Sequence, residues 1–137
     1  MNKVMLSNGA ANAAADAVGR LCDGGWLDIY EGEQPDTGDA PLPEGTKLLA
    51  SLQFGTPAFL PATGGAARAA GLSPDRDAAQ TGRPAWFRLY RADHETRVYD
   101  GDVGRTPEAA MVLRALLIAQ HAEVAVTEFV LTMPKSS

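Results

Sequence analysis

Cysteine is almost absent from this chain of 137 residues, and the single one, Cys22, excludes an internal disulfide and a cysteine-based zinc site. A lone cysteine is more often a small buried hydrophobe than a reactive thiol. The chain also lacks an apolar run of about 18 residues, so no membrane-spanning helix is expected. After Lys3 the apolar run ends at Leu6, and the Asn, Gly, Ala and Asp residues that follow do not fit a secretory signal peptide.

Positive charge is scarce and scattered. Twelve Lys and Arg stand against 17 Asp and Glu, which gives a net charge of −5, and no basic run occurs. Direct binding of nucleic acid or of an anionic membrane needs a basic surface, so we expect neither partner. Hydrophobic residues make up 45% of the chain and charged residues 21%, which is typical of a globular protein of one domain.

Motifs for catalysis are missing as well. There is no Gly-x-Ser-x-Gly elbow and no phosphate loop. His94 and His121 lie far apart in sequence with no second metal ligand at useful spacing, so we expect both to be solvated. Residues 100–102 lack the spacing of an EF-hand, and turn formation explains them. We therefore expect no catalytic residue, no cofactor and no metal, in a protein that is not an enzyme.

The strongest pattern that is present predicts a β-hairpin over residues 84–103. Two alternating runs rich in aromatic residues flank a charged tip at 91–96. Trp86, Arg88 and Tyr90 share one side of the first run. Core or subunit contact is favoured for the aromatic side chains, ahead of stacking on a sugar or a base.

A thin helix is predicted over residues 7–22, because alanine dominates there, Ser7 or Asn8 can cap its start and two glycines follow it. Its apolar stripe is small, so the helix must dock on another element. The stripe consists of Ala11, Ala14, Val18 and Leu21. Residues 31–46 are rich in proline, glycine and acidic side chains, which predicts a long exposed loop suited to contacts.

Further strands are predicted at 26–30, 47–54, 58–62, 66–72 and 124–133 from alternation and β-branched residues. The segment 107–120 is ambiguous. Thr106-Pro107-Glu108 is a helix-start signal, and good helix formers follow it. Propensity alone therefore favours a helix there.

Another pattern extends over nearly the whole chain. It comprises Leu6-Ser7-Asn8 with the Asn/Ala-rich helix, the run Gly-Gly-Trp-Leu-Asp-Ile-Tyr-Glu-Gly-Glu-Gln-Pro at 24–35, and residues 49–59, 82–90, 98–104 and 131–134. Together these segments resemble a family of small structural proteins of tailed bacteriophages and prophages. The resemblance implies a virion component with a β-sandwich body that works without a cofactor. It also favours a strand over 111–118 after a short helical turn at 106–110, although residues 107–117 depart from the family pattern.

On this basis we expect a mostly β protein: an antiparallel β-sandwich, jelly-roll or immunoglobulin-like, with an N-terminal α-helix. Residues 1–25 would form the helix and docking segment, 26–134 the sandwich and 135–137 a tail. The expected function is a head decoration or cement protein, or a neck, tail or baseplate component, in virions assembled in the host cytoplasm. Its partners would be other virion proteins and copies of itself.

The interface candidates combine the helix stripe with aromatic residues of the strands. They are Ala11, Ala14, Val18, Leu21, Trp26, Tyr30, Trp86 and Tyr90. The alternative function is a carbohydrate-binding adsorption module that uses aromatic side chains on its surface.

Overall fold

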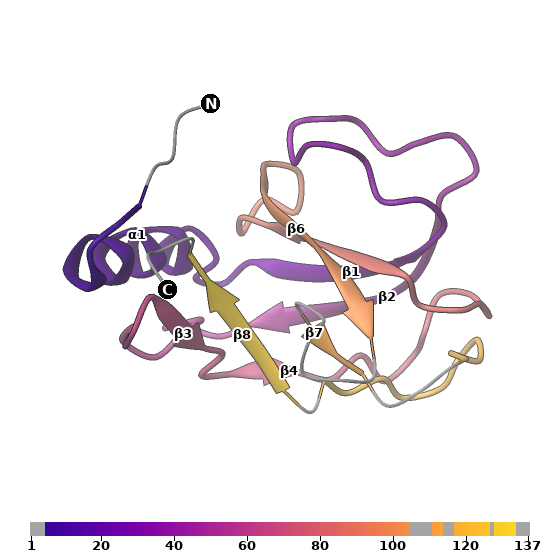
Figure 1. The fold of residues 1–137 in the computed structure, drawn as a ribbon. Helices are drawn as coiled ribbons and strands as arrows, with labels where there is room; N and C mark the ends of the chain where they lie inside the picture. The colour runs from indigo at the N-terminus through magenta and orange to yellow at the C-terminus, as the bar shows by residue number, and fades with distance from the viewer. Residues whose placement is uncertain (1–4, 105–110, 114–116, 127, 134–137) are drawn as a thin grey trace.

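The computed structural model describes residues 5–104, 111–113, 117–126 and 128–133. These residues form one helix and eight strands, and the chain is mostly β with a short N-terminal helix, as the sequence predicts (Figure 1). The elements are α1 (Asn8–Leu21), β1 (Trp26–Glu31), β2 (Lys47–Phe54), β3 (Ala66–Arg68), β4 (Leu72–Ser73), β5 (Trp86–Tyr90), β6 (Arg97–Gly104), β7 (Met111–Val112) and β8 (Glu128–Thr132). No helix in the described part of the chain has the length and apolar character needed to cross a membrane.

The described strands form one curled sheet with the order β3-β8-β7-β6-β5-β1-β2-β4. Neighbouring strands are antiparallel except β6 and β7, which run parallel, so the sheet is mixed. Its curvature makes it a half-barrel. The predicted β-sandwich is not confirmed, because these strands belong to one continuous sheet rather than to two packed ones.

One short segment links the two ends of the sheet. Within residues 66–73, Ala66–Arg68 pairs with β8 and Leu72–Ser73 pairs with β2. The predicted strand at 66–72 is therefore present as two short pieces that serve different neighbours.

The predicted hairpin at 84–103 is confirmed as β5 and β6, with the tip at residues 91–96. On its other side β5 pairs with β1, so β5 is a central strand, and all five of its residues are buried. The predicted strand at 47–54 is confirmed with the same bounds as β2.

Four phenylalanines form the centre of the core on the concave side of the sheet. The Phe129 ring lies 5.1 Å from the Phe87 ring and 5.7 Å from the Phe59 ring, and Phe54 completes the cluster. Aliphatic side chains surround these rings and are fully buried: Leu27, Ile29, Leu49, Leu52, Leu89 and Leu131. Alternation along β1 and β5 places Leu27, Ile29 and Leu89 on this side. On β2 a register shift opposite Ile29 and Tyr30 interrupts the alternation between Leu49 and Leu52.

Helix α1 packs against β3 and β8. The Ser7 hydroxyl caps its start by accepting a hydrogen bond from the Ala10 amide at 3.1 Å, as predicted. The buried side consists of Ala11, Ala15 and Gly19, so it shares only Ala11 with the predicted stripe. A Cβ on Gly19 would lie 3.3 Å from the Phe59 side chain, so a residue without a side chain lets the helix approach the core.

The ambiguous segment contains a strand at Met111–Val112, which agrees with the strand that the resemblance favours. The proposed helical turn at 106–110 and the tail at 135–137 lie outside the described residues. Two predicted strands are shorter than expected. Residues 58–62 contribute an isolated bridge between Phe59 and Ala69, and the last strand is confined to β8, with a separate bridge at Val124.

Candidate functional site

Polar and aromatic side chains cover the face of the sheet opposite the phenylalanine cluster, and most of them are buried. Alternation along β1 and β5 brings them side by side, and β6 adds an acidic residue. We call this set the polar face; it consists of Trp26, Asp28, Tyr30, Trp86, Arg88, Tyr90 and Asp100. Figure 1 shows the long loop after β1, residues 32–46, turning back toward the 91–96 tip. The Arg97 side chain joins the two by donating to the Asp39 carbonyl oxygen at 2.6 Å.

A buried ion pair lies at the middle of the polar face. Arg88 is fully buried and donates from Nε and Nη2 to the two carboxylate oxygens of Asp100, at 2.6 and 2.9 Å. The hydrogen bonds that Arg88 donates to Asp100 raise the pKa of Arg88, although burial acts in the opposite direction. The guanidinium carbon also lies 5.4 Å from the centre of the Trp86 ring, which suits a cation–π contact.

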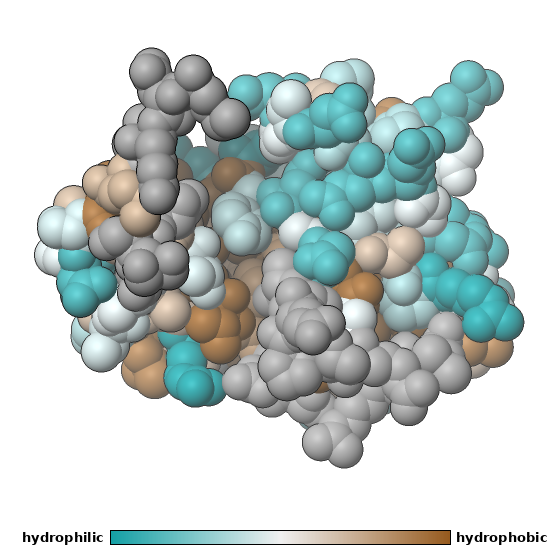
Figure 2. Space-filling view, in the orientation of Figure 1, coloured by the Kyte–Doolittle hydropathy of each residue, from teal (hydrophilic) through white to brown (hydrophobic). Residues whose placement is uncertain are grey.

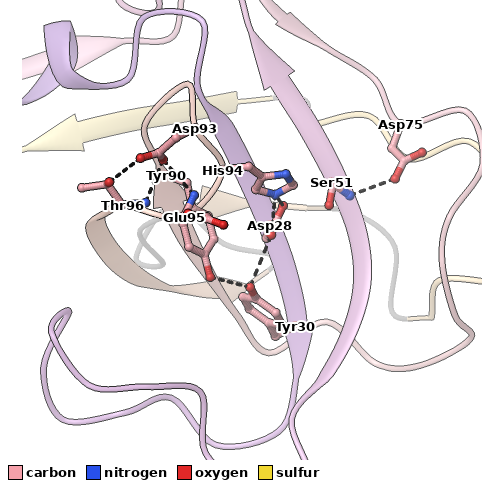
Figure 3. Close-up of polar contacts among 9 residues, drawn as sticks. All are labelled: Asp28, Tyr30, Ser51, Asp75, Tyr90, Asp93, His94, Glu95 and Thr96. Carbon is pink, nitrogen blue, oxygen red and sulfur yellow. Dashed lines mark hydrogen bonds and ion pairs between the residues drawn. The ribbon is translucent and has the colours of Figure 1, made fainter.

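His94 reaches from the hairpin tip onto the same face (Figure 3). Its Nε2 lies 2.9 Å from both carboxylate oxygens of Asp28, and its ring stacks on Trp26 with a centroid distance of 4.5 Å. Asp28 also accepts from the Tyr30 hydroxyl at 3.3 Å, and the Tyr30 and Tyr90 hydroxyl oxygens lie 2.9 Å apart. Burial is the main reason that the pKa of Tyr30 is raised.

The prediction that His94 is solvated is therefore wrong. Its side chain is 35% exposed and is held by a carboxylate and an indole ring. The backbone of His94 has a φ of 59°, a left-handed conformation that folds the tip back toward the sheet. His121 does lie at the surface, where its Nδ1 contacts Asp77 at 2.6 Å.

This arrangement does not assemble an activated nucleophile. Among the described residues, His94 Nδ1 has no hydrogen-bond partner, so no hydroxyl or thiol is paired with the histidine. Cys22 is buried, and burial is the main cause that raises the pKa of its thiol to about 12. A thiol with that pKa is protonated at neutral pH and is a poor nucleophile. No group of three metal-ligating side chains occurs in the part of the chain that the structure describes.

A turn at the hairpin tip fixes the segment that carries His94. The Asp93 carboxylate accepts hydrogen bonds from the Glu95 and Thr96 amides, each at 2.8 Å, and from the Thr96 hydroxyl. The bond from the Thr96 hydroxyl is the largest of the causes that lower the pKa of Asp93 to about 2. Charged Asp93 therefore holds the tip in the shape that brings His94 to Asp28.

A second candidate region lies at α1, on the opposite side of the molecule from the 32–46 loop (Figure 1). Three acceptors on one side of the helix satisfy backbone amides of the hairpin-like segment 58–69. Asn12 accepts from the Gly65 amide at 2.7 Å, and Asp16 and Asp23 accept from the Ala62 and Ala58 amides at 2.8 Å each. We call these three side chains the acceptor row; they close the edge of the sheet next to β3.

The outward side of the helix has a different character. Ala10, Ala14, Ala17 and Leu21 follow one another at helical spacing, and three of them are exposed while Ala14 is half-buried. We call these four residues the outer face of α1; no charged side chain belongs to it. A surface helix ordinarily turns charged or polar side chains to solvent. Figure 2 shows the contrast across the molecule, with pale and brown residues at the α1 end and hydrophilic ones over the upper right.

Between the acceptor row and the chain at 57–61 lies a groove of about 300 Å³. The helix side of the groove is formed by Asp16, Gly19, Arg20 and Asp23, and the other side by Pro57, Phe59, Leu60 and Pro61. Leu60 is 50% exposed at its rim. The groove is therefore apolar at its floor and charged along the helix.

The eight predicted interface residues fall into two groups. Tyr30, Trp86 and Tyr90 are buried within the subunit, and Trp26 is half-buried beneath His94. Ala11 is also buried, whereas Leu21 is exposed and Ala14 and Val18 are half-buried. The structure therefore places three of the four helix candidates, Ala14, Val18 and Leu21, near the surface, and the aromatic ones mostly inside.

Sequence reasoning missed the acceptor row and the contact between His94 and Asp28. The row has a readable signal, because Asn12, Asp16 and Asp23 are spaced by four and seven residues and so share one side of a helix. The contact between His94 and Asp28 has no such signal in the sequence, since it depends on how the hairpin tip folds over the sheet.

Comparison of the chain with protein-family models, curated proteins and solved structures gave no match. Its function is therefore proposed from its own residues and from the resemblance that they carry.

Proposed function

We propose that this protein is a non-enzymatic structural subunit of a tailed-bacteriophage virion, either a head decoration or cement protein or a neck, tail or baseplate component. Its partners are other virion proteins and copies of itself. One observation carries the proposal: the outer face of α1, from Ala10 to Leu21, is apolar and lacks a covering element among the described residues.

An uncharged outward face on α1 leaves apolar surface exposed to water, which is unfavourable in free energy. An apolar stripe on a helix is stable when another element removes it from water. Alanine side chains let a second backbone approach closely, and Leu21 offers a larger anchor at the end of the stripe. A single contact of this size is weak, but many copies on a symmetric particle add their contacts together.

The polar face supports a structural rather than a catalytic role. Arg88 is neutralised by Asp100, and Asp28 is occupied by His94 and Tyr30. Buried charges that pair with one another in this way fix one conformation. Two donors of the polar face, Arg88 Nη1 and Trp86 Nε1, are buried without a hydrogen-bond partner among the described residues.

The test introduces charge into the outer face of α1. We expect Ala17→Glu with Leu21→Glu to reduce the number of copies in purified virions at least tenfold, because two carboxylates would have to be buried at the contact. Quantitative mass spectrometry of particles measures the copy number. Leu42→Glu is the matched control, since Leu42 is an exposed leucine in the 32–46 loop, 44% exposed against 40% for Leu21. Wild-type copy number in the double variant, with its fold intact by circular dichroism, would contradict the proposal.

The carbohydrate-binding alternative has less support. It needs two or more aromatic rings on one accessible face, and Tyr30, Trp86 and Tyr90 are buried. We expect no binding on a glycan array. Binding that is lost in Trp26→Ala would favour the alternative.

The proposal also includes the finer fold class that the resemblance implies, a jelly-roll or immunoglobulin-like sandwich. An experimental structure tests it directly. Two sheets packed face to face would support the sandwich, and one continuous curled sheet would exclude it.

A further inference from the structure

We propose that the groove between α1 and residues 57–61 pairs two copies of this chain. Leu60 of each copy enters the groove of the other, and Arg20 of each copy pairs with Asp16 of the other. The inference deepens the proposed function, because it names a second copy as the partner of one defined surface at the α1 end.

The apolar part of the groove has both a cavity and a side chain to fill it. Gly19 has no side chain, and it lies next to Phe59 at the floor, where the groove encloses about 300 Å³. Leu60 stands at the rim and is 50% exposed, the second-largest exposure among the large hydrophobic side chains of the described residues. A leucine from a second copy would therefore meet an apolar floor while its counterpart enters the reciprocal groove.

The charged part of the groove is self-complementary. Asp16 and Asp23 each use one carboxylate oxygen, Oδ1, to accept a backbone amide, and the other oxygen has no partner among the described residues. Within the same residues, the Arg20 side chain makes no ion pair or hydrogen bond. One side of α1, together with Asp23 just after its C-cap, thus presents an unpaired guanidinium between two carboxylates that each have one unpaired oxygen.

A two-fold arrangement satisfies these groups reciprocally. When two α1 helices lie antiparallel with their groove-facing sides together, about an axis at the level of residue 18, Arg20 of one copy stands opposite Asp16 of the other, and the reverse pairing follows by symmetry. An isologous interface requires a surface that carries its own complement, and this surface carries both charge signs together with an apolar knob and a hole. Opposite charges so placed also fix the register of the pair.

Strand addition is a poor alternative for this edge. The Ala58, Ala62 and Gly65 amides already donate to the acceptor row, so an incoming strand would find these donors occupied. Contact through side chains in the groove remains. The patch is smaller than a stable interface, so we expect a weak dimer, with a dissociation constant of roughly 0.1–1 mM.

Analytical ultracentrifugation of the purified full chain tests the pairing. The wild type should shift from monomer to dimer as its concentration rises to about 1 mM. Arg20→Glu and Leu60→Ser should each weaken dimerisation at least fivefold, and Arg20→Lys should keep it. Asp16→Asn with Asp23→Asn should weaken it as well, and this variant keeps the fold because an amide oxygen still accepts the backbone amides, as Asn12 does.

Leu42→Ser is the matched control, an exposed leucine far along the chain from the groove, and it should leave the dimer unchanged. A chain that stays monomeric at about 1 mM would overturn the inference. So would equal loss in Leu42→Ser and Leu60→Ser, or cross-links in virions that join position 20 to a different protein and not to a second copy. The two tests are independent, because the ultracentrifugation uses the purified chain alone. A monomeric chain would contradict the groove pairing but not the virion proposal. Outer-face variants that still enter virions at wild-type copy number would contradict the virion proposal but not the groove pairing.

Discussion

Arg88 and Asp100 are the residues on which the polar face depends most, because each is buried and each neutralises the other. The side chains are 0% and 5% exposed. Taking two charges out of water costs several kcal/mol per ion, and the bidentate geometry offsets that cost only while both partners are present. Loss of one partner should therefore be far more harmful than loss of both.

We expect Asp100→Ala to reduce the free energy of unfolding by about 3–5 kcal/mol, because Arg88 would remain buried without its counter-ion. The double variant Arg88→Met with Asp100→Leu should recover most of this loss. Urea denaturation followed by tryptophan fluorescence measures both. Arg76→Ala is the control, since Arg76 pairs with Glu123 at 3.1 Å on the surface and should matter by less than about 1 kcal/mol. Equal losses in Asp100→Ala and Arg76→Ala would contradict the interpretation.

Asp93 makes the hairpin tip sensitive to acid. Its pKa is about 2 in the folded protein against an ordinary value of 3.8, so the carboxylate stabilises the tip above about pH 4. This contribution should be lost as the pH falls from about 4 to about 2. An NMR titration of the Asp93 carboxyl carbon, with the Thr96 amide as reporter, measures it. The Thr96 amide of Asp93→Asn should not titrate in this window, and an Asp93 midpoint near 4 would be inconsistent with the hydrogen bonds described above.

At the scale of elements, α1 is attached to the sheet by hydrogen bonds of the acceptor row as well as by its buried apolar side. We expect Asp23→Ala to lower the free energy of unfolding by about 1–3 kcal/mol, because the Ala58 amide loses its acceptor in a partly buried place. Asp23→Asn should retain most of the stability, since its amide oxygen accepts the same bond. Hydrogen exchange of the Ala58 amide gives a local readout, and faster exchange in Asp23→Ala alone is the expected result. Unchanged protection in that variant would remove the acceptor row as an anchor of α1.

The position of α1 was predictable from sequence, but its orientation was not. Ser7, the alanine run and Gly24 define the ends of the helix to within one residue. Val18 and Leu21 are its largest apolar side chains, and the prediction therefore placed the buried side of the helix at these two residues. The buried side is set instead by small residues next to Phe59, and it lies roughly 75° around the helix, at 3.6 residues per turn. Because alanine occurs on every side of this helix, hydrophobic periodicity gives little information about which side is buried.

Strands were predicted well where local alternation is strong, as in β2 and in the hairpin of β5 and β6. The order of the strands was not, because pairings such as β3 with β8 join residues more than sixty positions apart. The parallel pairing of β6 and β7 could not be predicted from the local sequence pattern either, since the pattern does not depend on the relative direction of two strands. Both sides of β5 are buried because the hairpin tip and the 32–46 loop cover the polar face, and this covering likewise could not be predicted from the sequence of β5.

At the scale of the whole molecule, helix and sheet share one core. Ala15 and Cys22 of the helical segment belong to the same buried cluster as Leu27, Phe59 and Phe129. The helix is therefore part of the fold, besides carrying the docking surface of the proposed function. Substitutions on the outer face separate the proposed docking from the contribution to folding.

We expect removal of residues 5–22 to prevent folding, because the core would be opened and three backbone amides of the segment 58–65 would lose their acceptors. Loss of the near-ultraviolet circular dichroism signal and of a cooperative urea transition is the expected measurement. Ala17→Glu should show the native signal in the same assay. A truncated chain with a cooperative transition would mean that the sheet holds its shape without the helix.

Residues 66–73 have a consequence for how the molecule opens. This stretch is hydrogen-bonded to β8 at its start and to β2 at its end, so the two strands that stand second from each end of the sheet order depend on the same few residues. When the stretch detaches, both lose a neighbour in one event. Amides on the exposed sides of β2 and β8 should therefore exchange with solvent at matching rates, as one cooperative unit, although few residues of either strand touch the other.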